Sequence, residues 1–200
     1  MTAMLPQLRD ALLALQQRDF AVRAELEADG TLFEGYHPRM EAVHLDNATQ
    51  LRNLITSFGW PNEQLAGPDG AEAAWLIAQH SIAEPDFMRS CRELIRNELA
   101  DGRVPLWQYA YIDDRIRVSE GKPQRYGTQI ELTPDGPVLC EVEDPQALES
   151  LRLEAGLPPA GERLQRMAAG PRPTPEEFKE RKKLELLWRQ KVGWAAAVDF

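Results

Sequence analysis

The chain has 200 residues, of which 43% are hydrophobic and 28% are charged, and its formal net charge is −9 at pH 7. A domain of this size buries roughly 70% of its unfolded surface, so it needs neither disulfides nor a structural metal to fold. The acidic charge argues against nucleic acid as a partner, because binding phosphates requires a basic face.

The N-terminal half has the periodicity of a series of amphipathic helices. The first helix has an apolar stripe that includes Leu8, Leu12 and Leu15. Glycines that stop a helix, such as Gly30 and Gly59, follow the first two helices. Residues 31–44 show no clear period, and we expect a loop there. The sequence predicts helices over about 6–28, 46–58, 70–80, 85–99 and 105–119.

After Gly121 the pattern changes to alternation of the kind that strands show. Residues 124–132 alternate, residues 138–142 alternate again, and Thr133 to Gly136 have the composition of a turn. We therefore predict one small β-hairpin over about Gln124–Val142.

The C-terminal part returns to helical patterns. We expect helices over about 145–154 and 160–167, then a proline-rich linker over 169–175 and a charged helix and tail over 176–200. The fold class is mainly α, a helical bundle with one small β-hairpin, and residues 1–168 form a single helical domain. The 176–191 helix has more basic than acidic residues, so a protein partner could bind there. A solvated helix face explains the same charges.

Cysteine usage and hydropathy indicate a cytoplasmic protein that does not bind membranes. Cys91 and Cys140 form neither a disulfide framework nor a zinc pattern. No segment approaches the length of apolar chain that spans a membrane.

Two polar residues, Gln79 and His80, follow an apolar helical run. At least one of them lies toward the buried side, where a polar group requires a hydrogen-bond partner. One interpretation is a core histidine held in a network. The other is a general acid/base at His80, because histidine titrates nearest neutral pH.

Asp114 and Arg115 are charged residues on the predicted 105–119 helix. Arg115 lies on the same face of this helix as Trp107 and Tyr111. Such a pair either stabilises the neighbouring loop or acts on a ligand, and Arg115 has the planar fork that suits a carboxylate. We consider Asp114 and Arg115 as catalytic candidates beside His80.

Residues 121–129 concentrate amide, hydroxyl and phenol groups around two glycines. These groups offer donors and acceptors without fixed charge, so they suit a polar substrate. A polar edge strand explains the segment equally well. The substrate-binding candidates are four residues of this segment and the glutamine that precedes His80: Gln124, Tyr126, Thr128, Gln129 and Gln79.

The sequence predicts no metal site and no cofactor. The histidines are His37, His44 and His80, and no two of them have the four-residue spacing of a helical metal site. A site assembled only in three dimensions is the remaining alternative.

Several short motifs follow one another along the chain: Gly59-Trp60-Pro61, Ala74 to Ile77 with Gln79-His80, Asp114-Arg115, Gly121 to Gln129, Glu143-Asp144, and Arg152 before Gly156-Leu157. Their order resembles a bacterial family known only as a domain of unknown function, with a QH…DR…GxxQxYGTQ pattern over about residues 45–157. Its members often continue Gln-His with Ala-Asp, whereas this chain reads Ser81-Ile82 after His80. The resemblance therefore implies an acidic partner for His80 that is missing beside it, and Glu84 or Asp86 could replace it.

These observations favour a small cofactor-free enzyme with His80 as acid/base, acting on a small polar metabolite or a peptide side chain. Hydrolase, lyase and isomerase chemistry all fit. The alternative is a non-catalytic module that binds a small ligand or another protein through the same polar residues, and a toxin-like or immunity-like protein is a third option.

Overall fold

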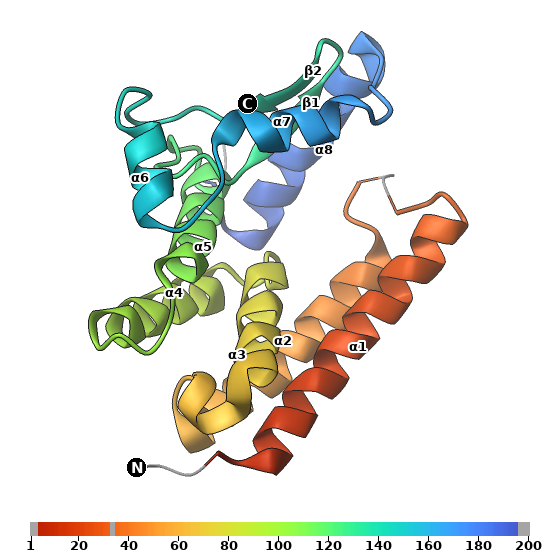
Figure 1. Cartoon of the computed structure of the whole chain (residues 1–200). Coiled ribbons are helices and arrows are strands. Elements are labelled where there is room, and N and C mark those ends of the chain that lie inside the picture. The colour runs from red at the N-terminus through yellow and green to blue at the C-terminus, as the bar shows by residue number, and fades with distance from the viewer. Residues whose placement is uncertain (1–3, 33–34, 196–200) are drawn as a thin grey trace. The chain divides into compact units, whose positions relative to one another are not determined.

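The computed structural model describes residues 4–32 and 35–195, and within these residues it has eight helices and one two-stranded antiparallel sheet (Figure 1). The predicted fold class, mainly α with one hairpin, is confirmed. Contacts divide the chain into two compact units, Met1–Val104 and Pro105–Phe200, which are described separately below. The predicted boundaries at 168 and 175 stay a prediction, and the end of the predicted tail, 196–200, lies outside the described residues.

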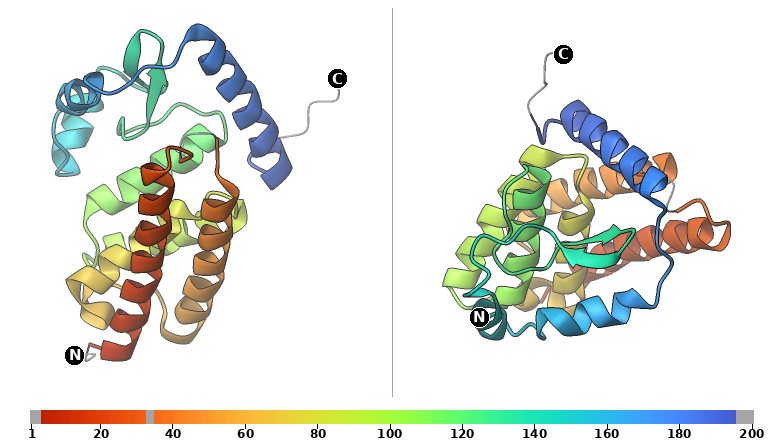
Figure 2. Two further views of the ribbon diagram at one scale, coloured as in Figure 1. Left: turned by 90° about the vertical axis from the view of Figure 1, so that its right-hand side faces the viewer. Right: turned by 90° about the horizontal axis from the view of Figure 1, so that it is seen from above.

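The first unit contains four helices, and three of them pack together around its core. Leucines of the first helix, including Leu8 and Leu12, are buried in this core. Two views show the first three helices side by side (Figures 1 and 2). Of the helices in the described part of the chain, none is apolar over a stretch long enough to span a membrane. The four helices are α1 (Pro6–Ala28), α2 (Pro38–Phe58), α3 (Glu63–His80) and α4 (Pro85–Ala100).

Helix α2 begins eight residues before the predicted start at Asp46, so the prediction of a loop up to His44 was wrong. His37 caps the helix, because its Nδ1 accepts a hydrogen bond from the backbone N–H of Arg39 at 3.1 Å. Pro38 follows in the first turn, where a missing N–H leaves no helical bond unmade. The earlier start places His44 inside a helix.

The second unit contains the hairpin and the other four helices. Ala110, Tyr126 and Ala155 form a buried apolar cluster. Thr174 and Glu177 form a capping box at the start of the last helix. The elements are α5 (Leu106–Ser119), β1 (Ile130–Thr133), β2 (Gly136–Leu139), α6 (Leu148–Glu154), α7 (Ala160–Ala168) and α8 (Pro175–Val192).

The hairpin is shorter than the predicted span of Gln124–Val142. Its strands pair from Ile130 with Leu139 to Thr133 with Gly136. Residues 124–129 form a loop rather than a strand, with one isolated bridge between Gln124 and Val142. The reason is that the backbone amides of Arg125, Tyr126 and Thr128 bond to one side chain and not to a neighbouring strand.

That side chain is Asp114, which is 0% exposed on α5. Its carboxylate accepts hydrogen bonds from the backbone N–H groups of Arg125 at 2.7 Å, Tyr126 at 3.1 Å and Thr128 at 2.9 Å. It also accepts one from the Thr128 hydroxyl at 3.0 Å. A buried carboxylate is thus stabilised by several donors of one loop, which fixes the loop's conformation.

Two arginines bind the carbonyl groups of the same loop. Arg152, which is 2% exposed, donates from Nη1 to the carbonyl oxygens of Tyr126 at 2.6 Å and Gly127 at 3.0 Å. Arg163 donates to the carbonyl oxygen of Thr128 at 2.9 Å. The loop therefore lies between a carboxylate on its amide side and guanidinium groups on its carbonyl side.

We predict that Asp114→Asn destabilises the protein by about 3 kcal/mol, because an amide cannot accept all these bonds and leaves buried N–H groups of the loop without an acceptor. Urea unfolding of both proteins measures the difference. Asp135→Asn, at an exposed position in the hairpin turn, is the matched control and should unfold like the wild type. Equal midpoints for Asp114→Asn and the control would contradict the assigned role.

Candidate functional site

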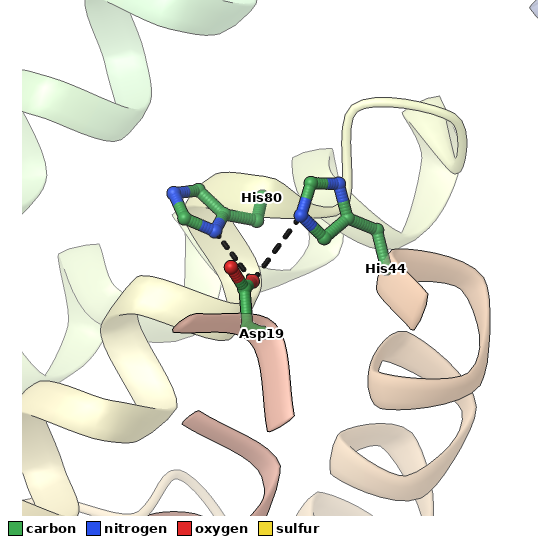
Figure 3. Close-up of side chains that lie close together, drawn as sticks. All are labelled: Asp19, His44 and His80. Carbon is green, nitrogen blue, oxygen red and sulfur yellow. Dashed lines mark hydrogen bonds and ion pairs between the residues drawn. The ribbon is translucent and has the colours of Figure 1, made fainter. Parts of the chain in front are cut away.

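Three polar side chains from three helices of the first unit meet at one point (Figure 3). Asp19 comes from α1, His44 from α2, and His80 is the last residue of α3. The Nδ1 atom of His80 lies 2.7 Å from Oδ2 of Asp19, and Nε2 of His44 lies 3.2 Å from the same oxygen. We call Asp19, His44 and His80 the Asp-His-His cluster.

Asp19 occupies a core position of α1. It follows Leu15 by four residues and precedes Leu26 by seven, so it continues the buried stripe of the helix. Its side chain is 1% exposed. A carboxylate in such a position is costly unless charged or hydrogen-bonding partners compensate for the lost water. The two imidazoles are those partners.

Burial and the histidines act on the Asp19 carboxyl in opposite directions. Burial by itself raises the pKa of Asp19, but the contacts with His44 and His80 outweigh it and hold that pKa well below its usual range. The carboxyl is therefore ionised at neutral pH. Its second oxygen, Oδ1, is buried and has no hydrogen-bond partner among the described residues.

Tyr36 orients His44. The Tyr36 hydroxyl lies 2.7 Å from Nδ1 of His44, and the two rings stack with centroids 5.7 Å apart. Tyr36 in turn packs against the buried residues Leu26 and Met40. The His44 side chain is thus fixed by contacts on one ring nitrogen while the other nitrogen faces Asp19.

His80 is the most accessible member of the cluster, with 22% of its side chain exposed. Its Nε2 atom points away from Asp19 and His44 (Figure 3). Glu84 and Asp86 are the partners considered from the sequence, but Glu84 pairs with Arg52 and Asp86 pairs with Arg89. The acidic partner of His80 is instead Asp19, which lies 61 residues earlier in the chain.

Asp19 and His44 were missed by the sequence analysis, although one signal for Asp19 is present. A charged residue at a stripe position of an otherwise apolar helix face indicates a buried charge with a partner. His44 gave no usable signal, because it fell in a segment predicted to be a loop.

The other sequence candidates lie mostly in the second unit. Gln124 donates to the carbonyl oxygens of Gln129 and Cys140, both at 2.9 Å, and accepts from the N–H of Gln129 at 2.8 Å. Thr128 is 1% exposed and bonds to Asp114. Side-chain hydrogen bonds within the unit thus use much of the polar capacity of Gln124, Thr128 and Asp114.

Three further candidates of the second unit have more varied surroundings. Tyr126 is buried, and burial raises the pKa of its phenol. Gln129 donates to the Thr128 hydroxyl at 3.0 Å, and Arg115 is partly buried on α5. Gln79, next to His80, is buried in the first unit. A single site that joins His80 to the second-unit residues stays a prediction.

The ionisation of Asp19 predicts how stability depends on pH. A carboxyl whose folded pKa is depressed contributes stability that is fully present above its unfolded value near 4 and is lost as pH falls through the folded value. From pH 6 to pH 3 the wild type should lose more stability than Asp19→Asn, by about 1 kcal/mol, because pH 3 lies a little less than one pKa unit below the unfolded value of this carboxyl.

Urea unfolding at both pH values measures this difference. Asp10→Asn, at an exposed position on the same helix, should follow the wild type. Parallel losses in the wild type and in Asp19→Asn would show that the cluster does not lower the pKa of Asp19.

Comparison with known proteins gives the family. A family model described as a family of unknown function, DUF6624, matches residues 6–170. Curated proteins and solved structures gave no match. The matched region is longer than the 45–157 over which the sequence resembles a family of unknown function, and it contains both the Asp-His-His cluster and the loop held by Asp114. The chain belongs to the DUF6624 family, a family of unknown function.

Proposed function

We propose that the protein is an enzyme in which His80 is the general acid/base for a small polar substrate. The observation that carries the proposal is the 2.7 Å contact between Nδ1 of His80 and the buried carboxylate of Asp19. A carboxylate that only accepts hydrogen bonds selects the tautomer with hydrogen on Nδ1. The lone pair of His80 is then on Nε2, the nitrogen that points away from the cluster.

The charge of Asp19 also favours the protonated state that a general base must reach. When Nε2 of His80 takes a proton, the resulting imidazolium lies beside a carboxylate that is already ionised. The carboxylate orients the ring and stabilises its positive charge without becoming protonated itself, as in other catalytic Asp-His pairs. Histidine is suited to this work because it titrates near neutral pH.

Proton transfer by one side chain, without a cofactor, limits the reaction classes that fit the proposal. A single acid/base group serves hydrolysis, elimination or isomerisation, so a hydrolase, a lyase and an isomerase all fit. We propose a small polar metabolite or a peptide side chain as substrate and the cytoplasm as the compartment. In this proposal Asp114 is a structural residue, since one loop occupies its carboxylate.

The alternative is a binding or interaction module in which the cluster only stabilises the packing of α1, α2 and α3. The burial of Asp19 and His44 favours this interpretation, because buried polar groups need partners in any protein. The two proposals differ in what His80 contributes beyond its bond to Asp19.

Two substitutions separate the roles of the two His80 nitrogens. The amide nitrogen of Asn can occupy the place of Nδ1, so His80→Asn keeps the donor to Asp19 and removes Nε2. His80→Gln reaches toward the place of Nε2 and loses the donor beside Asp19. We predict that His80→Asn unfolds within about 1 kcal/mol of the wild type, whereas His80→Gln loses about 1–3 kcal/mol.

Activity then tests the catalytic claim. A panel of polar esters, amides, hydroxy acids and modified peptides is followed by NMR for turnover, with His37→Asn as the control because Asn also caps a helix well. The wild type and the control should convert at least one compound, and His80→Asn should be slower by about 100-fold or more. Equal turnover by His80→Asn, or no turnover of any compound by the wild type, counts against the enzyme and in favour of the binding module.

A further inference from the structure

Nε2 of His44 and Oδ2 of Asp19 form an ion-pair contact that lacks hydrogen-bond geometry. The two atoms, Nε2 and Oδ2, are 3.2 Å apart, yet Nε2 of His44 is buried without a hydrogen bond among the described residues. The other oxygen of Asp19 is buried and also makes no hydrogen bond there. A ring nitrogen 3.2 Å from a carboxylate oxygen, without hydrogen-bond geometry, has the spacing of two ligands of a common ion as well as that of an ion pair.

The distances within the cluster fit such an ion. One ligand atom from each of Asp19, His44 and His80 lies within 4.8 Å of the others. In a tetrahedral site with bonds of about 2.0 Å, neighbouring ligand atoms are about 3.3 Å apart. The separations of 2.7 and 3.2 Å from Oδ2 to the two nitrogens are already near that value. Side-chain rotations that shorten the longest separation by at most about 1.5 Å complete the geometry.

The surroundings of His44 are those of a metal-binding histidine. Such histidines have the second ring nitrogen hydrogen-bonded to a neighbouring group, which fixes the tautomer and aims the other nitrogen at the ion. Here the Tyr36 hydroxyl lies 2.7 Å from Nδ1 of His44, and Nε2 faces Asp19. Of the two tautomers that this contact allows, the one with hydrogen on Nδ1, donated to the Tyr36 oxygen, has its lone pair on Nε2 and can bind an ion there.

We propose that Asp19, His44 and His80 bind one divalent transition-metal ion, with Zn²⁺ as the reference ion. Two imidazole nitrogens and one carboxylate oxygen favour zinc, cobalt, nickel or ferrous iron over magnesium and calcium, which prefer ligand sets made of oxygen. Three protein ligands leave at least one position for water, and the partial exposure of His80 gives access to it. The proposal departs from the expectation of no metal, which rested on spacing along the sequence.

The ion would take the place that the proton holds between His80 and Asp19 in the metal-free protein. If the proposed function holds, occupancy of the cluster therefore suppresses the acid/base activity of His80. This consequence rests on the proposed function, whereas the binding site itself rests on the geometry alone.

Cobalt titration of the full-length, metal-free protein tests the site, because Co²⁺ bound by nitrogen and oxygen ligands has visible d–d absorption. The wild type should bind one equivalent, and Zn²⁺ should displace it. Asp19→Asn and His44→Asn should weaken binding by more than about 100-fold, and Tyr36→Phe, which keeps all three ligands, by about tenfold. His37→Asn is the control, because it removes a histidine outside the cluster, and it should bind like the wild type.

Two results would overturn the site: no stoichiometric binding by the wild type, or unchanged affinity in Asp19→Asn and His44→Asn variants that circular dichroism shows to be folded. Turnover assays with and without Zn²⁺ address the proposed function separately. Loss of turnover on addition of Zn²⁺ supports both proposals. Turnover that requires the ion supports the site and overturns metal-free acid/base catalysis, and turnover without any metal binding overturns only the site.

Discussion

A carboxylate in the core of a helical protein has to be compensated, and in the first unit this requirement falls on Asp19. Its side chain is fully buried on the face of α1 that otherwise carries leucines. Leaving a carboxylate there without partners would cost several kcal/mol. The imidazoles of His44 and His80 reach it from α2 and α3, so the packing of three helices and the ionisation of one side chain depend on each other. Removing one imidazole therefore changes both the stability of the helix packing and the ionisation of Asp19.

The second unit compensates a buried carboxylate in a different way. Asp114 is bound by backbone amides and a hydroxyl, which do not titrate, and Arg152 on the other side of the loop stays charged throughout the normal pH range. That arrangement fixes a loop and has no second state. The partners of Asp19 are imidazoles, which exchange protons and bind metals near neutral pH. This difference in chemistry, more than any difference in burial, is why we place the proposed function at the Asp-His-His cluster.

Much of the fold could be predicted from the sequence, because the apolar periodicity and the capping residues are local signals. Helix α1 has the predicted limits, Pro6–Ala28, and the helix after Pro85 and the hairpin turn are where composition placed them. The start of α2 was missed because its cap is a histidine, an uncommon capping residue. The loop before β1 was predicted as a strand because its alternating pattern does not reveal the bonds to Asp114.

His80 was identified as a candidate because it interrupts an apolar run. Its partners could not be predicted, since Asp19 is 61 residues away and only tertiary packing brings the two together.

In the proposed mechanism Asp19 holds the proton of His80 on Nδ1, so that the lone pair of the neutral ring is on Nε2. Long-range proton–nitrogen NMR of the imidazole rings in the metal-free protein at neutral pH measures this directly, because protonated and unprotonated ring nitrogens have well-separated ¹⁵N shifts. We expect a protonated Nδ1 and an unprotonated Nε2 for neutral His80, with the preference lost in Asp19→Asn. A neutral His80 ring that carries its proton on Nε2 in the wild type, or a tautomer that Asp19→Asn leaves unchanged, would contradict it.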